Sequence, residues 1–463
     1  MSRICNTFSN LIFGAFIKLK TLNRHDLNFY RFYSKNFLRV VYFCFLVSTV
    51  ILIVFFISTN LDYAKEVVVV NESISPTVSE TVQFTMLDKI KEGRELLRKS
   101  SPLEYETKYY TLKRGVKIKT GDLVRKQVAL AVLNKNTGEV FEQRFWVKEQ
   151  DIKNYKKTKI INVQLVSSGA DTGALNVNWW NSFNSDYSFP DKQELIVVAN
   201  KYLFPSKYLS GLPEKTGGQY TDIVYVPYSK KLHLSEIVEA GKKYLEKNIE
   251  QAFIELEAAK VKSRSLPGAL ITDGISRDLL RNIMVVEHID PDGFRSATDG
   301  GQELSERVLT IIGANQEYAY RYTGSPAGAS GLAQFIQPTY KNMVSKYPEA
   351  KMIKDYNAGM ANHSNAVKAM VLFFDSHKKE ISNKITRKEI AKPLGISEDM
   401  LAATYNGGPG RVVKAVNKLG LAWFTSQLKL SRANQIMRQE TLNYVKKFQA
   451  VKSLNLFANI SGG

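Results

Sequence analysis

An uncharged run from Val40 to Ser58 constrains this chain more than any other feature of its sequence. The run holds nineteen residues and is rich in Val, Ile, Leu and Phe. As a helix, that length just crosses the roughly 30 Å hydrocarbon core of a bilayer. The run lies too deep in the chain for a cleavable signal peptide, and it lacks the small residues of a cleavage site. We therefore expect one transmembrane helix over residues 40–59, which anchors the chain in a cell membrane.

The residues before this run predict its orientation. Residues 1–39 contain a single acid, Asp26, against seven basic residues: Arg3, Lys18, Lys20, Arg24, Arg31, Lys35 and Arg39. Such an excess of Lys and Arg keeps a segment on the cytoplasmic side. We expect a single-pass protein of the inner (cytoplasmic) membrane, with its N-terminus in the cytoplasm and everything after Thr59 outside. The two cysteines, Cys5 and Cys44, then leave the exported part without a disulfide.

Length and composition limit what the exported part does. The chain has 463 residues, which predicts two or three domains, and 44% of them are hydrophobic and 23% charged, which is typical of globular protein. The formal net charge is +20, but the basic residues are spread along the chain with acids between them. We interpret this charge as attraction to anionic cell-wall polymers and lipid head groups, and we expect no nucleic-acid partner.

The pattern of apolar residues predicts an α+β protein. Alternation between Gly and Asn turns favours a small, mostly antiparallel β domain, with strands at 109–118, 128–134, 139–147, 159–166 and 194–204. Of the adjacent Trp179 and Trp180, we expect one ring buried and one partly exposed. The expected order after the membrane helix is a linker with a short helix (60–103), the β-rich domain (104–232), a long charged helix (233–264) and an α-rich domain (266–452).

Three segments of the α-rich domain carry the functional signal. They are GASGLAQFIQPTY at 328–340, ATYNGGPGRV at 403–412 and QETLNYVKKF at 439–448. In this order they resemble the catalytic domain of soluble lytic transglycosylases, which are lysozyme-like enzymes that cleave the glycan strands of bacterial peptidoglycan. The resemblance covers about residues 266–452. It implies a lysozyme-like fold and peptidoglycan as the partner.

Cleavage of a glycosidic bond requires a carboxylic acid that is still protonated near neutral pH. Burial among apolar groups raises a carboxyl pKa, because the charged form loses its solvation. Glu287 fits this requirement, since it continues the apolar stripe of Leu280, Ile283 and Met284. Its helix must end soon afterwards, because Pro291 disfavours helical geometry at the residue before it.

Glu317 competes with Glu287 for this role. In the family, the catalytic Glu usually precedes the Gln of the first segment by just under twenty residues. Glu317 lies 17 residues before Gln334, and Glu287 lies 47 before it. Spacing therefore favours Glu317, whereas the expected burial favours Glu287, with 295–326 as an insertion that carries an extra helix. We expect Glu287 to be the acid and keep Glu317 as the alternative.

The resemblance also implies a set of substrate-binding residues: Gly331, Gln334, Tyr405, Asn406, Glu440 and Tyr444. Gly331 lets the backbone approach the substrate, and Gln334 offers a donor and an acceptor to an N-acetyl sugar. The phenol of Tyr405 is expected to bond the acid or the sugar. Glu440 and Tyr444 are expected to make polar contacts on the far wall of the substrate groove. This chain departs from the family pattern at three positions, where it has His288, Ala333 and Thr404 in place of Ser, Met and Ala.

The family mechanism uses one Glu, first as acid and then as base. It cleaves the β-1,4 bond between MurNAc and GlcNAc and leaves a 1,6-anhydro-muramyl end. Two alternatives stay open. A lysozyme-type muramidase would need a second acid, for which Asp290, Asp292 and Asp299 are candidates. A catalytically inactive cell-wall scaffold would instead work with proteins of an envelope-spanning machine. The histidines show no metal-ligand spacing, and we expect no cofactor.

Overall fold

The computed structural model describes residues 84–458, apart from 112–116, 167–170 and 393–394. Residues Thr81–Gly463 form one compact unit. The predicted cytoplasmic segment, the predicted membrane helix at 40–59 and most of the linker lie outside the described residues. Within the described ranges, no helix is both long enough and apolar enough to cross a membrane.

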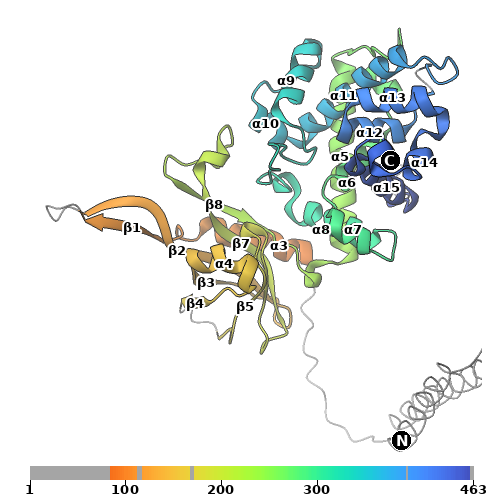
Figure 1. Ribbon diagram of the computed structural model, residues 1–463. Helices are drawn as coiled ribbons and strands as arrows, with labels where there is room; N and C mark the ends of the chain where they lie inside the picture. The colour runs from red at the N-terminus through yellow and green to blue at the C-terminus, as the bar shows by residue number, and fades with distance from the viewer. Residues whose placement is uncertain (1–83, 112–116, 167–170, 393–394, 459–463) are drawn as a thin grey trace, which may run out of the picture. The chain divides into compact units, whose positions relative to one another are not determined.

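The first half of the described chain is built around an antiparallel sheet (Figure 1). Its strand order is β4-β3-β2-β7-β8, with β1 paired to β2. The strands are β1 (Tyr105–Thr111), β2 (Lys117–Asn134), β3 (Val140–Lys148), β4 (Val163–Val166), β7 (Leu195–Pro205) and β8 (Tyr220–Tyr225). A separate pair joins β5 (Asn176–Trp179) to β6 (Asp186–Ser188). The expected mixed α+β class with an antiparallel sheet is confirmed.

Strand β2 explains why the centre of the sheet is apolar on both faces. Every residue from Val128 to Leu133 is fully buried. One set of alternate residues, with Ala129 and Ala131, packs under helix α3 (Met86–Lys99). The other set packs with Trp180 and Phe183 in the main core. A strand covered on both faces is a continuous apolar run, which is what VALAVL is.

Of two further predictions for the β region, one is wrong and one is confirmed. The prediction of a single strand at 109–118 is wrong, because Thr111 pairs with Lys117 and the chain therefore reverses between β1 and β2. The alternation of apolar and polar residues can continue through such a reversal, so the sequence pattern alone does not reveal where the chain turns back. The expectation for the two tryptophans is confirmed, since Trp179 is 41% exposed and Trp180 is 8% exposed.

The second half of the described chain is helical. The long charged helix is confirmed as α5 (Ser235–Ala258), and it packs closely on α8 (Gln302–Asn315). At this crossing a Cβ on Gly241 would overlap the carbonyl oxygen of Leu309, and a Cβ on Gly313 would overlap that of Ile237. The two glycines thus let the helix backbones touch.

The remaining helices follow the chain order. They are α4 (Glu149–Thr158), α6 (Arg277–Val286), α7 (Pro291–Ser296), α9 (Gln337–Lys346), α10 (Tyr356–Ala361), α11 (His363–Lys384), α12 (Glu398–Gly407), α13 (Pro409–Leu419), α14 (Trp423–Leu428) and α15 (Gln439–Ser453). Helix α11 is buried along most of its length. Helix α15 packs against α12 and α6, so the last of the three motif segments reaches the end of the helix that carries Glu287.

Candidate active site

Glu287 stands at the C-terminal end of α6. Ser276 caps the start of this helix by accepting a 3.3 Å hydrogen bond from the backbone N–H of Leu279. Leu280, Ile283 and Met284 are all fully buried, as their stripe predicts. Glu287 follows directly on this apolar face, still in helical geometry, and its N–H donates to the carbonyl of Ile283.

The carboxyl of Glu287 is held in a poorly hydrated place. The residue as a whole is partly exposed, but burial of the carboxyl raises its pKa from 4.5 to about 7. Two groups of α15 act in the opposite direction. The phenol of Tyr444 donates a 2.6 Å hydrogen bond to Oε1 of Glu287, and the charge of nearby Lys447 favours the ionised acid.

Lys447 is itself buried. Its ammonium donates a 2.9 Å hydrogen bond to the carbonyl of Ile289, and burial lowers its pKa from 10.5 to about 8. Sequence reasoning did not select this residue. The available signal was its position three residues after Tyr444, which puts both side chains on one face of a helix.

A cleft of about 610 Å³ opens beside Glu287. Three of the predicted substrate-binding residues line it, namely Gln334, Tyr405 and Asn406. Phe373 and His377 of α11 add an aromatic surface, with ring centroids 4.0 Å apart. Among the described residues that line this cleft, Glu287 is the only one with a carboxylate.

The loop before α9 forms one side of this cleft. Gly331 has φ +70°, and a Cβ there would lie 2.7 Å from the carbonyl oxygen of Met360. Only glycine fits both conditions. Gly331 is buried, and it lines a neighbouring cavity rather than this cleft. Gln334 also has a positive φ, of 50°, and its amide nitrogen donates a 2.7 Å hydrogen bond back to the carbonyl of Gly331.

Tyr405 and Asn406 come from the end of α12. The phenol of Tyr405 donates to the carbonyl of Ala333, and its ring packs against Phe373, with centroids 5.2 Å apart. Of the two partners expected for this phenol, the acid is bonded by Tyr444 instead. A bond from Tyr405 to the sugar stays a prediction. Asn406 accepts a 2.8 Å hydrogen bond from the hydroxyl of Thr441, which ties α12 to α15.

The other predicted carboxylates lie elsewhere. Glu440 is exposed in the first turn of α15 and is not among the residues that line the cleft. The side chain of Glu317 is 57% exposed and lies 3.6 Å from Nη2 of Arg94. It borders a separate cavity together with Tyr244 and His363.

The three aspartates that follow Glu287 have structural contacts of their own. Asp290 accepts a 2.6 Å hydrogen bond from the N–H of Gly293 and so caps α7. Asp299 accepts from two backbone N–H groups at the start of α8, which lowers its pKa. Asp292 pairs with Arg295 at the surface. None of the three is among the cleft residues.

His288 links the end of α6 to the cleft loop. Its ring stacks on Tyr320 with centroids 3.5 Å apart, and its Nε2 lies 2.9 Å from the carbonyl oxygen of Leu332. Burial lowers the pKa of His288 to about 3, so the ring is neutral at physiological pH. Because a carbonyl only accepts, Nε2 carries the proton and donates it in this bond. His288 therefore positions the loop that holds Ala333 and Gln334.

No protein-family model and no curated protein sequence matches this chain. In the part of the chain that the structure describes, no group of three or more His, Cys, Asp or Glu side chains is arranged to hold a metal ion.

Proposed function

We propose that this protein is a membrane-anchored peptidoglycan lytic transglycosylase that uses Glu287 as its acid and base. It cleaves the β-1,4 bond between MurNAc and GlcNAc and leaves 1,6-anhydro-muramyl ends. The observation that carries the proposal is a carboxyl with a pKa of about 7 at the wall of a 610 Å³ cleft, beside Tyr405 and Gln334. The helical lobe that holds the cleft, about residues 266–452, is proposed to be lysozyme-like.

The chemistry requires one group to act twice. Protonated Glu287 donates its proton to the bridging oxygen as the bond from that oxygen to the anomeric carbon of MurNAc breaks. The resulting carboxylate then takes the proton of the muramyl 6-hydroxyl, whose oxygen bonds to the same anomeric carbon. This second step closes the anhydro ring and returns Glu287 to its protonated form. A pKa near the working pH suits both steps, because neither protonation state is strongly disfavoured.

Among the described residues that line the cleft there is no second acid, which favours this route over hydrolysis. A retaining hydrolase places a second carboxylate roughly 5 Å from the acid, and an inverting one places it farther away. Asp290 and Asp299 cap helices, and Asp292 pairs with Arg295. These contacts leave Glu287 as the one carboxylate among the described residues that line the cleft.

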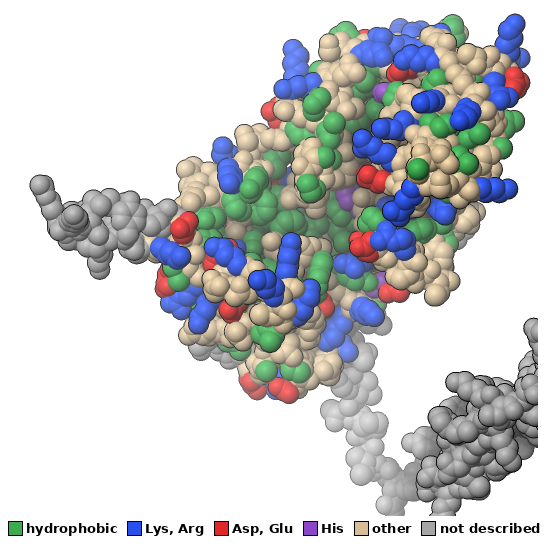
Figure 2. Space-filling model, in the orientation of Figure 1, with side chains coloured by type: hydrophobic (Ala, Val, Ile, Leu, Met, Phe, Trp, Pro, Cys, Tyr) green, Lys and Arg blue, Asp and Glu red, His purple; other side chains and the backbone are tan. Residues whose placement is uncertain are grey.

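The proposed location rests on the residues before Thr59. An anchor at 40–59 in the inner membrane, with a basic cytoplasmic N-terminus, would put the cleft on the outer side, where peptidoglycan lies. Figure 2 shows Lys and Arg side chains scattered over the described part of one face, with Asp and Glu between them. Such a surface suits a general attraction to anionic wall polymers.

Digestion of purified peptidoglycan by the full-length protein tests this proposal. Mass spectrometry of the soluble products should show muramyl ends that are lighter by one water than reducing ends. Reducing ends in their place would identify a muramidase. Sedimentation of the protein with peptidoglycan, without any release of soluble fragments, would identify a wall-binding scaffold.

A further inference from the structure

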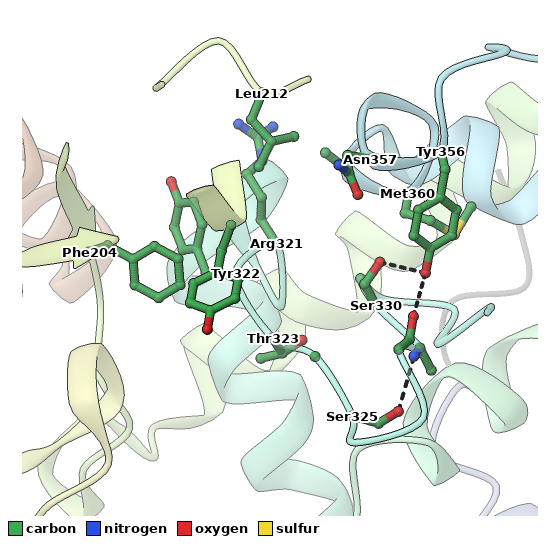
Figure 3. A pocket seen from close by; sticks show the side chains of 16 residues that line it. Phe204, Leu212, Arg321, Tyr322, Thr323, Ser325, Ser330, Tyr356, Asn357 and Met360 are labelled. Carbon is green, nitrogen blue, oxygen red and sulfur yellow. Dashed lines mark hydrogen bonds between the residues drawn. The ribbon is translucent and has the colours of Figure 1, made fainter. Parts of the chain in front are cut away.

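A second cavity, of about 460 Å³, is shown in Figure 3 and shares the lining residue Ala329 with the first. One wall comes from the end of β7 and the connection to β8, with Phe204, Tyr208 and Leu212. Tyr322 of the helical half lies beside Phe204, with ring centroids 5.9 Å apart, and Tyr356 and Asn357 of α10 lie across the cavity from them. The sheet therefore contributes directly to a cavity next to the candidate active site.

Three contacts hold the β7–β8 connection against the helical half. The amide nitrogen of Asn357 donates a 2.7 Å hydrogen bond to the carbonyl of Ser210. Gly211 has φ +81°, and a Cβ there would lie 2.5 Å from Oδ1 of Asp355. Arg321 forms an ion pair with Glu214. These contacts, made by consecutive parts of one loop, fix the wall of the cavity.

The two cavities share the loop that precedes α9. Ala329 lines both of them. The hydroxyl of Tyr356 lies 2.9 Å from the carbonyl oxygen of Gly328 and 2.6 Å from that of Phe335, which holds the two ends of this loop together. Ala329 is therefore the point at which a polymer in the first cleft would reach the second cavity.

The second cavity suits an uncharged ligand with apolar faces and hydroxyl groups. Four aromatic rings and the hydroxyls of Thr323, Ser325 and Ser330 line it. Arg321 is the only charged residue among its described lining residues, and Glu214 balances that charge. Aromatic rings with a few fixed polar groups are typical of a site for a neutral molecule. A peptide carboxylate or ammonium would find no unpaired opposite charge among these lining residues.

We propose that this cavity binds a further N-acetyl sugar of the same glycan strand, next to the sugars in the cleft. The proposal rests on the proposed function and gives the β-rich region a role in substrate binding. Tyr208 is the residue to test, because it is 63% exposed and belongs to neither core cluster. Its ring lies 6.1 Å from that of Phe204, so the two form one aromatic surface.

The test measures binding without turnover. Full-length protein carrying Glu287→Gln is titrated with short and long β-1,4-linked oligomers of N-acetylglucosamine by calorimetry. Adding Tyr208→Ala should weaken binding of the long oligomers about fivefold, which is what the loss of one aromatic contact of roughly 1 kcal/mol gives. Binding of the short oligomers should not change. Leu421→Ala is the matched control, since Leu421 is 74% exposed and lines neither cavity.

Two outcomes overturn this inference alone. One is an unchanged affinity for long oligomers in the Tyr208→Ala protein, while the unsubstituted protein cleaves peptidoglycan. The other is an equal loss for short and long oligomers. If the unsubstituted protein neither binds any oligomer nor cleaves peptidoglycan, the proposed function fails and the inference fails with it.

Discussion

The phenol of Tyr444 donates a 2.6 Å hydrogen bond to Oε1 of Glu287, and so joins α15 to the end of α6 across 157 residues of sequence. This bond stabilises the ionised acid, as does the charge of Lys447, which lies on the same face of α15. Burial outweighs both and holds the pKa of Glu287 near 7. The helix that carries these two residues thus adjusts the acid by a hydrogen bond and by charge.

The activity should follow the protonation of Glu287. We expect kcat/KM on peptidoglycan to fall as the pH rises above about 7, because the free protein then loses the proton that it must donate. In Tyr444→Phe the ionised carboxylate of Glu287 loses a hydrogen bond, so the pKa of Glu287 rises. The fall in kcat/KM should then occur at a higher pH. A pH profile of kcat/KM for both proteins measures this. A fall at the same pH, or at a lower one, would show that Tyr444 does not act on the acid.

Lys447 should also affect the fall of kcat/KM at high pH, and it should do so through its charge. Its ammonium lowers the pKa of Glu287, so Lys447→Met should also move the fall in kcat/KM to higher pH. The neighbouring Lys446 is exposed, and Lys446→Met is the matched control, with an unchanged profile. Equal profiles for the two variants would contradict this role. Circular dichroism checks the fold, because Lys447→Met also leaves the carbonyl of Ile289 without its bond.

Glu287 should cost the folded protein stability at neutral and alkaline pH. Its pKa is raised from 4.5 to about 7 on folding, so the unfolded chain binds fewer protons than the native one between these values. Stability from this group is therefore complete below about pH 4.5 and is lost as the pH rises to about 7. Glu287→Gln should be more stable than the unsubstituted protein at pH 8, by on the order of 2–3 kcal/mol, and equally stable at pH 4.

Urea unfolding of both full-length proteins at the two pH values measures this difference. The variant keeps an acceptor for the phenol of Tyr444, so the comparison isolates the charge. A variant that is less stable at pH 8 would show that the carboxyl is not buried as the structure has it.

A side chain at either glycine where α5 and α8 cross, Gly241 or Gly313, should destabilise the protein. Gly241→Ala puts a methyl group into the carbonyl oxygen of Leu309, so the helices must separate. We expect a loss of about 1–3 kcal/mol or more in the free energy of unfolding. Gly410→Ala is the control, because nothing lies within 4 Å of a Cβ at that position. Equal stability of the two variants in urea unfolding would contradict this close packing.

Local periodicity was enough to predict that Glu287 continues a buried helix face and to predict several of the main elements. The spacing of Leu280, Ile283 and Met284 placed Glu287 on a buried face, because that pattern needs only one helix. The long helix α5 was likewise visible in the sequence. The break between β1 and β2 was not, since the alternation runs through it.

Contacts between elements that are distant in the sequence could not be predicted from sequence patterns. Tyr444 was expected on the far wall of a groove, and its bond to Glu287 depends on how α15 packs on α6. Lys447 is buried in the same way, and a lysine in a helical pattern ordinarily indicates an exposed face. The second cavity depends on a loop between two strands that reaches α10, and no local pattern predicts such a contact.

The most direct test of the account is the rate at which purified peptidoglycan is solubilised by two full-length variants, Glu287→Gln and Glu317→Gln. The account predicts that Glu287→Gln lowers the rate by a factor of at least about 100, because a positioned acid contributes roughly 10²–10⁴. Glu317→Gln should act like the unsubstituted protein, since Glu317 faces solvent beside Arg94. Full activity in Glu287→Gln, or a loss confined to Glu317→Gln, would contradict it.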